Sequence, residues 1–254
     1  MPSWTLPVVL SPFIGSFVAV LIRRLPAEQA VALSRSRCEA CGHVLGPLDL
    51  IPLVSAALLR MRCRWCGVRF SFAHVAVELA CLTIAVCAVS LGSDSLLVWS
   101  GCVLAWSLLA LAWIDWEHLL LPDALTLPLL LAGLVATLLS DSAAITDHAA
   151  AATAGYIAFR IIEVSYRRLR GHDGLGQGDA RLLAAGGAWV GLTALPSLVF
   201  TAALCGLALA AGLRIAGRLI DRGTAIPFGP PLCLAILVTW MGFDPIQALT
   251  EWLP

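Results

Sequence analysis

The sequence predicts an all-α, polytopic membrane protein with about eight transmembrane helices and a small cytoplasmic, zinc-ribbon-like loop domain. Three observations lead to this fold class. Hydrophobic residues make up 60% of the 254 residues and charged residues only 13%, which is too apolar for a soluble globular domain. Several apolar runs approach the roughly 20 residues that cross a bilayer. The longest polar segment carries two C-x-x-C pairs.

The apolar runs mark the expected spans. They cover residues 4–22, 75–91, 96–114, 124–140, 148–165, 180–194, 196–213 and 229–243. No positive residue precedes the first run and no small-residue cleavage pattern follows it, so we expect a permanent span rather than a removable signal peptide. The expected division is a first transmembrane helix (1–23), a cytoplasmic four-cysteine loop domain (24–74) and a seven-helix membrane domain (75–254).

The arginines orient these spans. All 16 basic residues are arginines, and eight of them lie between residues 23 and 74. The others lie in or near the connections 166–179 and 214–228, whereas the remaining connections hold none. By the positive-inside rule, eight spans with both termini outside place every arginine on the cytoplasmic side. Arginines dispersed among spans in this way do not indicate nucleic-acid binding.

Two aspartates lie at the expected cytoplasmic membrane face. Asp115 follows the third apolar run, and Asp179 closes the turn Gly174-Leu175-Gly176-Gln177-Gly178-Asp179 before the sixth. An ionisable side chain at the edge of a hydrocarbon layer is costly and marks a functional site by default. The turn glycines allow an extended substrate to approach closely.

Two carboxylates that share a water molecule can hydrolyse a peptide when one is ionised and the other protonated. Like charge and partial desolvation keep one proton on such a pair near neutral pH. We therefore predict that Asp115 and Asp179 form one proteolytic dyad. Helix capping is the structural alternative, because an aspartate oxygen accepts from the free amides of a first helical turn. Capping stays open for Asp179 and is preferred for Asp123, at the start of the fourth span.

The polar loop after the first span predicts a metal site. Cys38 and Cys41 form one C-x-x-C pair and Cys63 and Cys66 the other, with 21 residues between the pairs. Two such knuckles supply four thiolates for tetrahedral zinc, and a closed four-cysteine site folds a loop rather than catalyses. Redox chemistry and unligated thiols are the alternatives, since disulfides are disfavoured in the cytoplasm. His43 could replace one ligand.

Segments along nearly the whole chain resemble the signatures of bacterial type IV prepilin peptidases, which belong to the GxGD class of intramembrane aspartic proteases. In chain order they are Gly15-Ser16-Phe17 with Arg24-Leu25-Pro26, Ser36-Arg37-Cys38 with the paired cysteines, and residues 121–128, 176–191 and 226–230. Some positions depart from the family pattern. His74 stands where tyrosine is common, and Arg181 replaces the frequent lysine after GxGD.

The resemblance implies a reaction. Family members cut a basic leader from type IV prepilins or type II secretion pseudopilins at the cytoplasmic face of the bacterial inner membrane. Many then methylate the new N-terminus with S-adenosylmethionine. It implies Asp115 and Asp179 as the catalytic pair, with an active-site loop that contains Gly176, Gly178, Arg181, Pro227, Gly229 and Pro230. Glu78 is a candidate for binding S-adenosylmethionine, although an interaction with His74 explains its position equally well.

The last of these loops suggests a way to hold the substrate. Pro227, Pro230 and Pro231 cannot complete helix hydrogen bonds. We expect their loop to leave backbone groups free for an extended substrate that adds as a strand.

Two other functions are compatible with buried carboxylates. One is a small ion- or proton-coupled membrane transporter that uses the same aspartates. The other is a non-catalytic subunit of a secretion machine. The four-cysteine loop and the absence of a repeat between the two halves disfavour the transporter, and a prepilin cleavage assay separates both alternatives from a peptidase.

Overall fold

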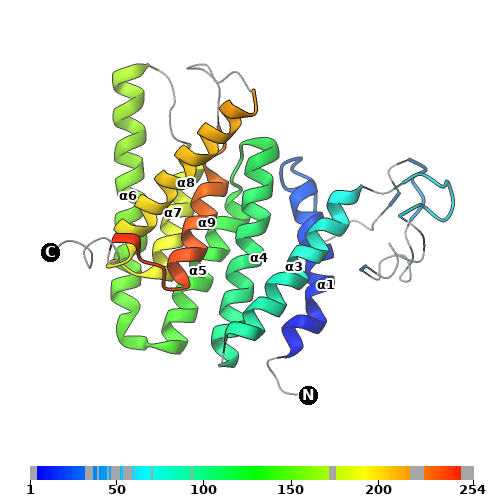
Figure 1. Cartoon of the computed structure of the whole chain (residues 1–254), viewed down its shortest axis with the longest axis horizontal. Helices are drawn as coiled ribbons and strands as arrows, with labels where there is room; N and C mark the ends of the chain where they lie inside the picture. The colour runs from blue at the N-terminus through cyan, green and yellow to red at the C-terminus, as the bar shows by residue number, and fades with distance from the viewer. Residues whose placement is uncertain are drawn as a thin grey trace. The chain divides into compact units, whose positions relative to one another are not determined.

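The structure, a computed structural model, describes residues 5–31, 37–38, 40–44, 46, 52–53, 59, 61–69, 71–92, 94–171, 176–217 and 226–246. Helices dominate this part of the chain (Figure 1). In chain order the elements are α1 (Leu6–Arg24), α3 (Phe72–Leu91), α4 (Ser95–His118), α5 (Asp123–Ser140), η3 (Ser142–Ala144), α6 (Ile145–Arg170), α7 (Gln177–Val190), α8 (Leu195–Ile215) and α9 (Gly229–Trp240).

Each of the eight apolar runs is a helix, which confirms the all-α fold class. Five helices, namely α1, α3, α4, α5 and α8, are long and apolar enough to cross a bilayer, and α9 is a shorter apolar helix. The 14 residues of α7 would span only about 21 Å at about 1.5 Å per residue, less than the bilayer core of about 30 Å. The 26-residue helix α6 is long enough but carries many charged side chains.

Helices α4 and α6 each continue several residues past their expected ends. Helix α4 continues to His118, so Asp115 lies within its last turn rather than after its end. Helix α6 extends to Arg170, where Gly171 ends it in the left-handed conformation with φ of 74°. Glycine adopts a positive φ of this kind without strain, whereas other residues rarely do.

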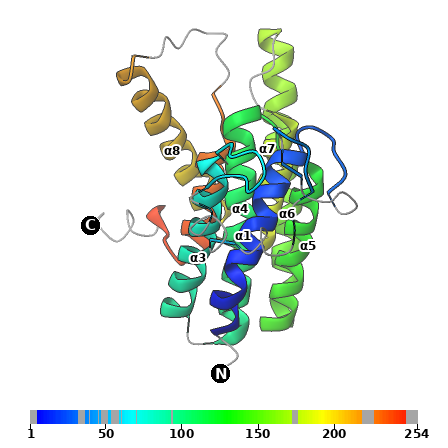
Figure 2. The same ribbon diagram turned by 90° about the vertical axis from the view of Figure 1, so that its right-hand side faces the viewer.

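The described chain divides into two compact units, an N-terminal unit (Met1–Trp106) and a C-terminal unit (Ser107–Pro254). In the N-terminal unit, α1 and α3 lie side by side (Figures 1 and 2). Gly15 permits this close approach, because a Cβ at Gly15 would lie 2.7 Å from Glu78 Cα. The Trp106 indole donates a hydrogen bond of 3.0 Å to the Cys81 carbonyl and joins the middle of α4 to α3.

In the C-terminal unit, α7 is the central helix and contacts α5, α6 and α9. Ten of its 14 residues are buried. Small residues make this possible: a Cβ at Gly187 would lie 2.7 Å from the Ala151 carbonyl oxygen of α6, and one at Gly186 would lie 2.7 Å from Ile236 of α9. Small residues let membrane helices approach closely. Helix α7, which carries Asp179 in its first turn, therefore packs against three neighbouring helices.

Candidate active site and metal centre

Asp115 lies in the last turn of α4 and is 6% exposed. Its Oδ2 accepts a hydrogen bond of 2.8 Å from the backbone amide of Gly229, the first residue of α9. A helix N-terminus presents unpaired amides and partial positive charge, so it favours a carboxylate over a neutral group. The contact requires glycine, because a Cβ at Gly229 would lie 2.6 Å from Asp115 Oδ2.

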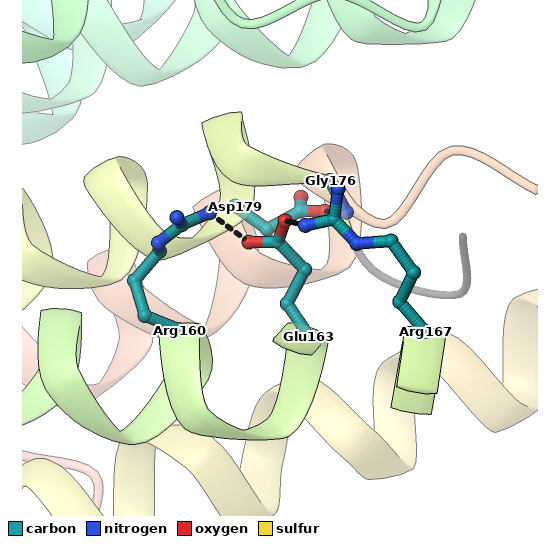
Figure 3. Close-up of polar contacts among 5 residues, drawn as sticks. All are labelled: Arg160, Glu163, Arg167, Gly176 and Asp179. Carbon is teal, nitrogen blue, oxygen red and sulfur yellow. Dashed lines mark hydrogen bonds and ion pairs between the residues drawn. The ribbon is translucent and has the colours of Figure 1, made fainter. Parts of the chain in front are cut away.

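Asp179 lies in the first turn of α7 and is 8% exposed. Its Oδ2 accepts a hydrogen bond of 3.0 Å from the Gly176 amide (Figure 3). Gly176 is the N-cap residue, so Asp179 caps the helix from its third position and not as the N-cap itself. The capping alternative thus correctly predicts that Asp179 accepts a backbone amide at the start of α7. Asp115 likewise accepts an amide at a helix N-terminus, from Gly229 of α9.

The two aspartates come together within the C-terminal unit. They lie near enough for their charges to interact. Cys233, one turn into α9, is within electrostatic reach of both carboxylates. Peptide hydrolysis by aspartates requires two carboxylates that share one proton and one water molecule. Helix α9 links them, because its first amide binds Asp115 and the helix packs against α7, which carries Asp179.

The glycine-rich turn has separate structural tasks. Gly176 supplies the N-cap of α7. A Cβ at Gly178 would lie 2.8 Å from Leu121 Cβ, so Gly178 allows the connection before α5 to pack against α7. Gly174 lies outside the described residues.

Asp123 does not have the expected capping role. It is the first residue of α5, Pro122 occupies the N-cap position, and no side-chain cap hydrogen bond is formed there. Its carboxylate instead forms an ion pair with Arg181 of α7. The pair connects the first residue of α5 with the second turn of α7, two residues after Asp179. The sequence could not reveal this partner, because the two residues are 58 positions apart.

The expected substrate-holding loop is also different. Ile226 to Phe228 precede α9, whereas Gly229, Pro230 and Pro231 form its first turn. Proline is well suited to this position, since the first-turn amides of a helix have no intrahelical partner. The amide of Gly229 is bonded to Asp115 and does not await a substrate strand. The prediction of a free strand-binding edge is therefore wrong for residues 229–231, while Pro227 remains in the irregular segment.

Glu163 on α6 is a buried carboxylate that the sequence reading missed. It is 2% exposed and forms ion pairs with Arg160 (2.5 Å) and Arg167 (2.7 Å), one on each carboxylate oxygen (Figure 3). The charge of Glu163 also acts on Asp179. The spacing of three and four residues along a helix was a readable signal for these ion pairs. The proximity of Glu163 to Asp179 could not be predicted from the sequence.

The four cysteines of the two C-x-x-C pairs come together in the N-terminal unit. Their sulfur atoms all lie within 4.8 Å of one another, with Cys38 to Cys66 at 3.7 Å and Cys41 to Cys63 at 4.0 Å. Thiolates about 2.3 Å from a central zinc ion lie about 3.8 Å apart in a tetrahedron. The observed spacing therefore fits a four-cysteine metal centre.

The two knuckles share one backbone pattern. The amide of Cys38 donates to the His43 carbonyl and that of Gly42 to the Cys38 carbonyl. In the second knuckle Cys63 donates to Val68 and Gly67 donates to Cys63. Gly42 and Gly67 have φ of 69° and 72°, a conformation that favours glycine. His43 stacks on Trp65 with ring centroids 3.8 Å apart and is not part of the cysteine cluster.

The thiols of the knuckles are in an environment suited to metal binding. Hydrogen bonds from the backbone amides of Cys41 and Ala40 lower the pKa of Cys38 to about 6. At Cys66 the Val68 amide acts in the same direction, but burial and the neighbouring sulfurs raise its pKa to about 12. Four thiols this close cannot all ionise without a cation. A divalent metal ion would relieve that repulsion.

Two family profiles match the chain. Residues 102–211, which include both aspartates, match the profile described as "Type IV leader peptidase family". Residues 9–91, which include the cysteines, match "Bacterial Peptidase A24 N-terminal domain". No solved structure matches the chain.

Three relatives carry the name "Prepilin leader peptidase/N-methyltransferase". The protein from Burkholderia pseudomallei (strain K96243) is 35% identical over 88% of this chain and 80% of its own length. The protein from Aeromonas hydrophila is 34% identical over 98% of this chain and 93% of its own. The protein from Dichelobacter nodosus is 35% identical over 97% and 94%.

Proposed function

This chain belongs to the type IV leader peptidase family, and we propose that it cuts the basic leader from type IV prepilins or type II secretion pseudopilins and then methylates the new N-terminus. The observation that carries the peptidase assignment is the pair of buried carboxylates, Asp115 and Asp179. Each accepts a backbone amide at the start of a helix. Nothing comparable supports the transporter alternative, which family membership disfavours.

Hydrolysis would use the dyad as an acid and a base. The ionised carboxylate takes a proton from the shared water, and the resulting hydroxide attacks the scissile carbonyl carbon. The protonated carboxyl donates to the carbonyl oxygen as charge develops there. Proton transfer to the leaving amine then breaks the carbon–nitrogen bond. The amides of Gly229 and Gly176 hold the carboxylates in place throughout, since helix N-termini in a packed unit do not reorganise during the reaction.

The membrane position of the site follows from the arginines. The chain is a multi-pass membrane protein of the bacterial inner membrane in this proposal, with both termini periplasmic and the dyad at the cytoplasmic face. A substrate with a basic leader and an apolar helix places its scissile bond at that same face. The exposed apolar side chains of the helices are suited to lateral contact with such a substrate in the bilayer.

The cysteine centre would hold zinc as a structural ion. Cys38, Cys41, Cys63 and Cys66 supply four sulfurs, so no position is left for a water or substrate ligand. The ion would fold the loop between α1 and α3. S-adenosylmethionine enters as the second substrate and supplies the methyl group.

The proposal is tested with purified protein in detergent and a synthetic prepilin. Mass spectrometry of the product N-terminus reports loss of the leader and, after addition of S-adenosylmethionine, the added methyl group. Both changes are expected. An intact precursor after prolonged incubation contradicts the peptidase assignment, and a cleaved product that stays unmethylated contradicts the second activity.

A further inference from the structure

The N-terminal unit contains a buried carboxylate that neither hydrolysis nor metal binding uses. Glu78 lies in the second turn of α3 and is 3% exposed. An ionisable group buried in an apolar helix is costly and marks a functional site unless a structural role accounts for it. Gly15 allows α1 to pack closely against this turn, because a Cβ at Gly15 would lie 2.7 Å from Glu78 Cα.

Glu78 sits among polar groups from three parts of the unit. Its Oε2 accepts a hydrogen bond of 2.9 Å from the Leu53 amide. Leu53 has a φ of 60°, which is unfavourable for leucine and indicates a backbone held in place by its surroundings. Its Oε1 lies 3.5 Å from His74 Nε2, and the same nitrogen lies 3.4 Å from Ser16 Oγ of α1.

The accessibility of these groups differs in a useful way. The His74 side chain is 37% exposed, whereas the Glu78 side chain is 4% exposed. A ligand can therefore reach the imidazole from outside, and its cationic end would lie against the desolvated carboxylate beside that ring. A desolvated anion attracts a cation more strongly than one in water does. The charged groups that act on His74 are Glu78 on its own helix and Arg23 at the end of α1.

We propose that Glu78 and His74 form the methyl-transfer site, with Glu78 binding the cationic α-amino group of the processed substrate and His74 accepting its proton. The assignment rests on the proposed methyltransferase function and gives it a location. Ser16 would orient the imidazole through its hydroxyl group. The methyl acceptor is thus a primary α-ammonium group at the end of an apolar peptide.

The chemistry balances with these two side chains and S-adenosylmethionine. Neutral His74 takes one proton from the α-ammonium, which leaves a neutral amine with a free electron pair. That pair attacks the methyl carbon of the sulfonium, the carbon–sulfur bond breaks, and its electrons stay on sulfur as a neutral thioether. The positive charge moves to the methylated nitrogen, where Glu78 stabilises it. Protonated His74 then releases its proton to water.

A purely structural role makes a different prediction. In that reading Glu78 only ties Leu53 and His74 to α3, and any change that loosens the start of α3 would impair methylation equally. Ser71→Ala is the matched control, because the Ser71 hydroxyl caps α3 at the Ala73 amide (3.3 Å). Loss of such a cap costs about 1 kcal/mol and removes no hydrogen bond of the Glu78 or His74 side chains.

The test uses a synthetic peptide that already lacks the leader, so that methylation is measured independently of cleavage. His74→Gln is expected to lower the methylation rate about a hundredfold, the usual contribution of a general base. Glu78→Gln is expected to lower it as well, with Glu78→Asp partly restoring it. Cleavage of full-length prepilin by the same preparations stays near the normal rate and shows that they are folded. Ser71→Ala keeps both activities.

Binding provides a readout apart from activity. Fluorescence anisotropy with the labelled peptide is expected to show that Glu78→Gln weakens binding of the free-amine form but not of the N-acetylated form. Normal methylation in Glu78→Gln and His74→Gln overturns the proposal, as does equal loss in Ser71→Ala or equal weakening for both peptides. Normal methylation of the leaderless peptide by wild-type protein that fails to cleave prepilin would contradict the peptidase assignment alone.

Discussion

The two units hold their buried carboxylates by different means. In the C-terminal unit, Asp115 and Asp179 accept backbone amides at the starts of α9 and α7. In the N-terminal unit, Glu78 accepts one loop amide and faces the titratable side chain of His74. A backbone amide stabilises an anion but cannot exchange a proton, whereas an imidazole can. The first arrangement suits two carboxylates that exchange protons with water, and the second suits a carboxylate that binds a cationic amine.

The units also differ in what holds them together. Helix α7 is packed through small residues against three neighbouring helices. The loop between α1 and α3 instead gathers four sulfurs within 4.8 Å. The proposed dyad therefore lies among closely packed helices and is held by helix-start amides, while the proposed metal ion would stabilise the N-terminal unit. The two activities should be separable by substitution.

The largest expected effect is loss of cleavage without loss of methylation. Asp179→Asn removes one member of the dyad, and removing a residue that acts as part of a catalytic pair costs about 10⁴-fold or more in rate. The same variant should still methylate a leaderless peptide, since Glu78 and His74 lie in the other unit. Initial rates of both reactions on one preparation give the comparison. Parallel loss of both activities would mean that the units do not act separately.

A smaller loss of cleavage is expected when the dyad is displaced rather than removed. Gly229→Ala places a Cβ 2.6 Å from Asp115 Oδ2, so the carboxylate or α9 must move. A misplacement of about 1 Å costs roughly a hundredfold in rate. The control is Gly212→Ala on α8, where an added Cβ meets nothing within 4 Å. Equal kcat/KM values for the two variants would contradict the assignment of Gly229 as a positioning residue.

Removing the metal should affect the opposite unit. Cys63 is buried at 3% exposure, and Cys63→Ser replaces one of four sulfurs with a poor zinc ligand. We expect the variant to lose its bound zinc, as measured by atomic emission, and to lose methylation while it retains most cleavage. Cys87→Ser on α3, an exposed cysteine outside the cluster, is the control. Full zinc content in Cys63→Ser would contradict the four-sulfur assignment.

The smallest effects concern stability. Glu163→Gln leaves Arg160 and Arg167 against a neutral amide, which should cost about 1–3 kcal/mol of unfolding free energy and lower the Tm. Asp123→Asn breaks the half-exposed pair with Arg181 and should cost at most about 1 kcal/mol. Thermal unfolding in one detergent ranks the two variants. A larger decrease in Tm for Asp123→Asn would reverse the assigned order of the two ion pairs.

Features that depend on neighbouring residues can be predicted from this sequence, whereas contacts between distant residues cannot. Apolar runs and C-x-x-C spacing are local signals, so the helices and the cysteine cluster were readable. The partner of Asp123 could not be predicted, because Arg181 is 58 residues away in the sequence and the local pattern favoured helix capping instead. The same holds for the contact of Gly229 with Asp115, where a proline-rich segment that reads as a loop begins α9. Tertiary packing decided these cases.

The central claim is that Asp115 and Asp179 activate one water molecule as a unit. The most direct measurement compares the prepilin cleavage rates of Asp115→Asn, Asp179→Asn and the double variant. Residues that act as one unit are strongly non-additive, so each single variant should be as inactive as the double variant. Substantial cleavage by either single variant, or losses that multiply in the double variant, would contradict the shared dyad.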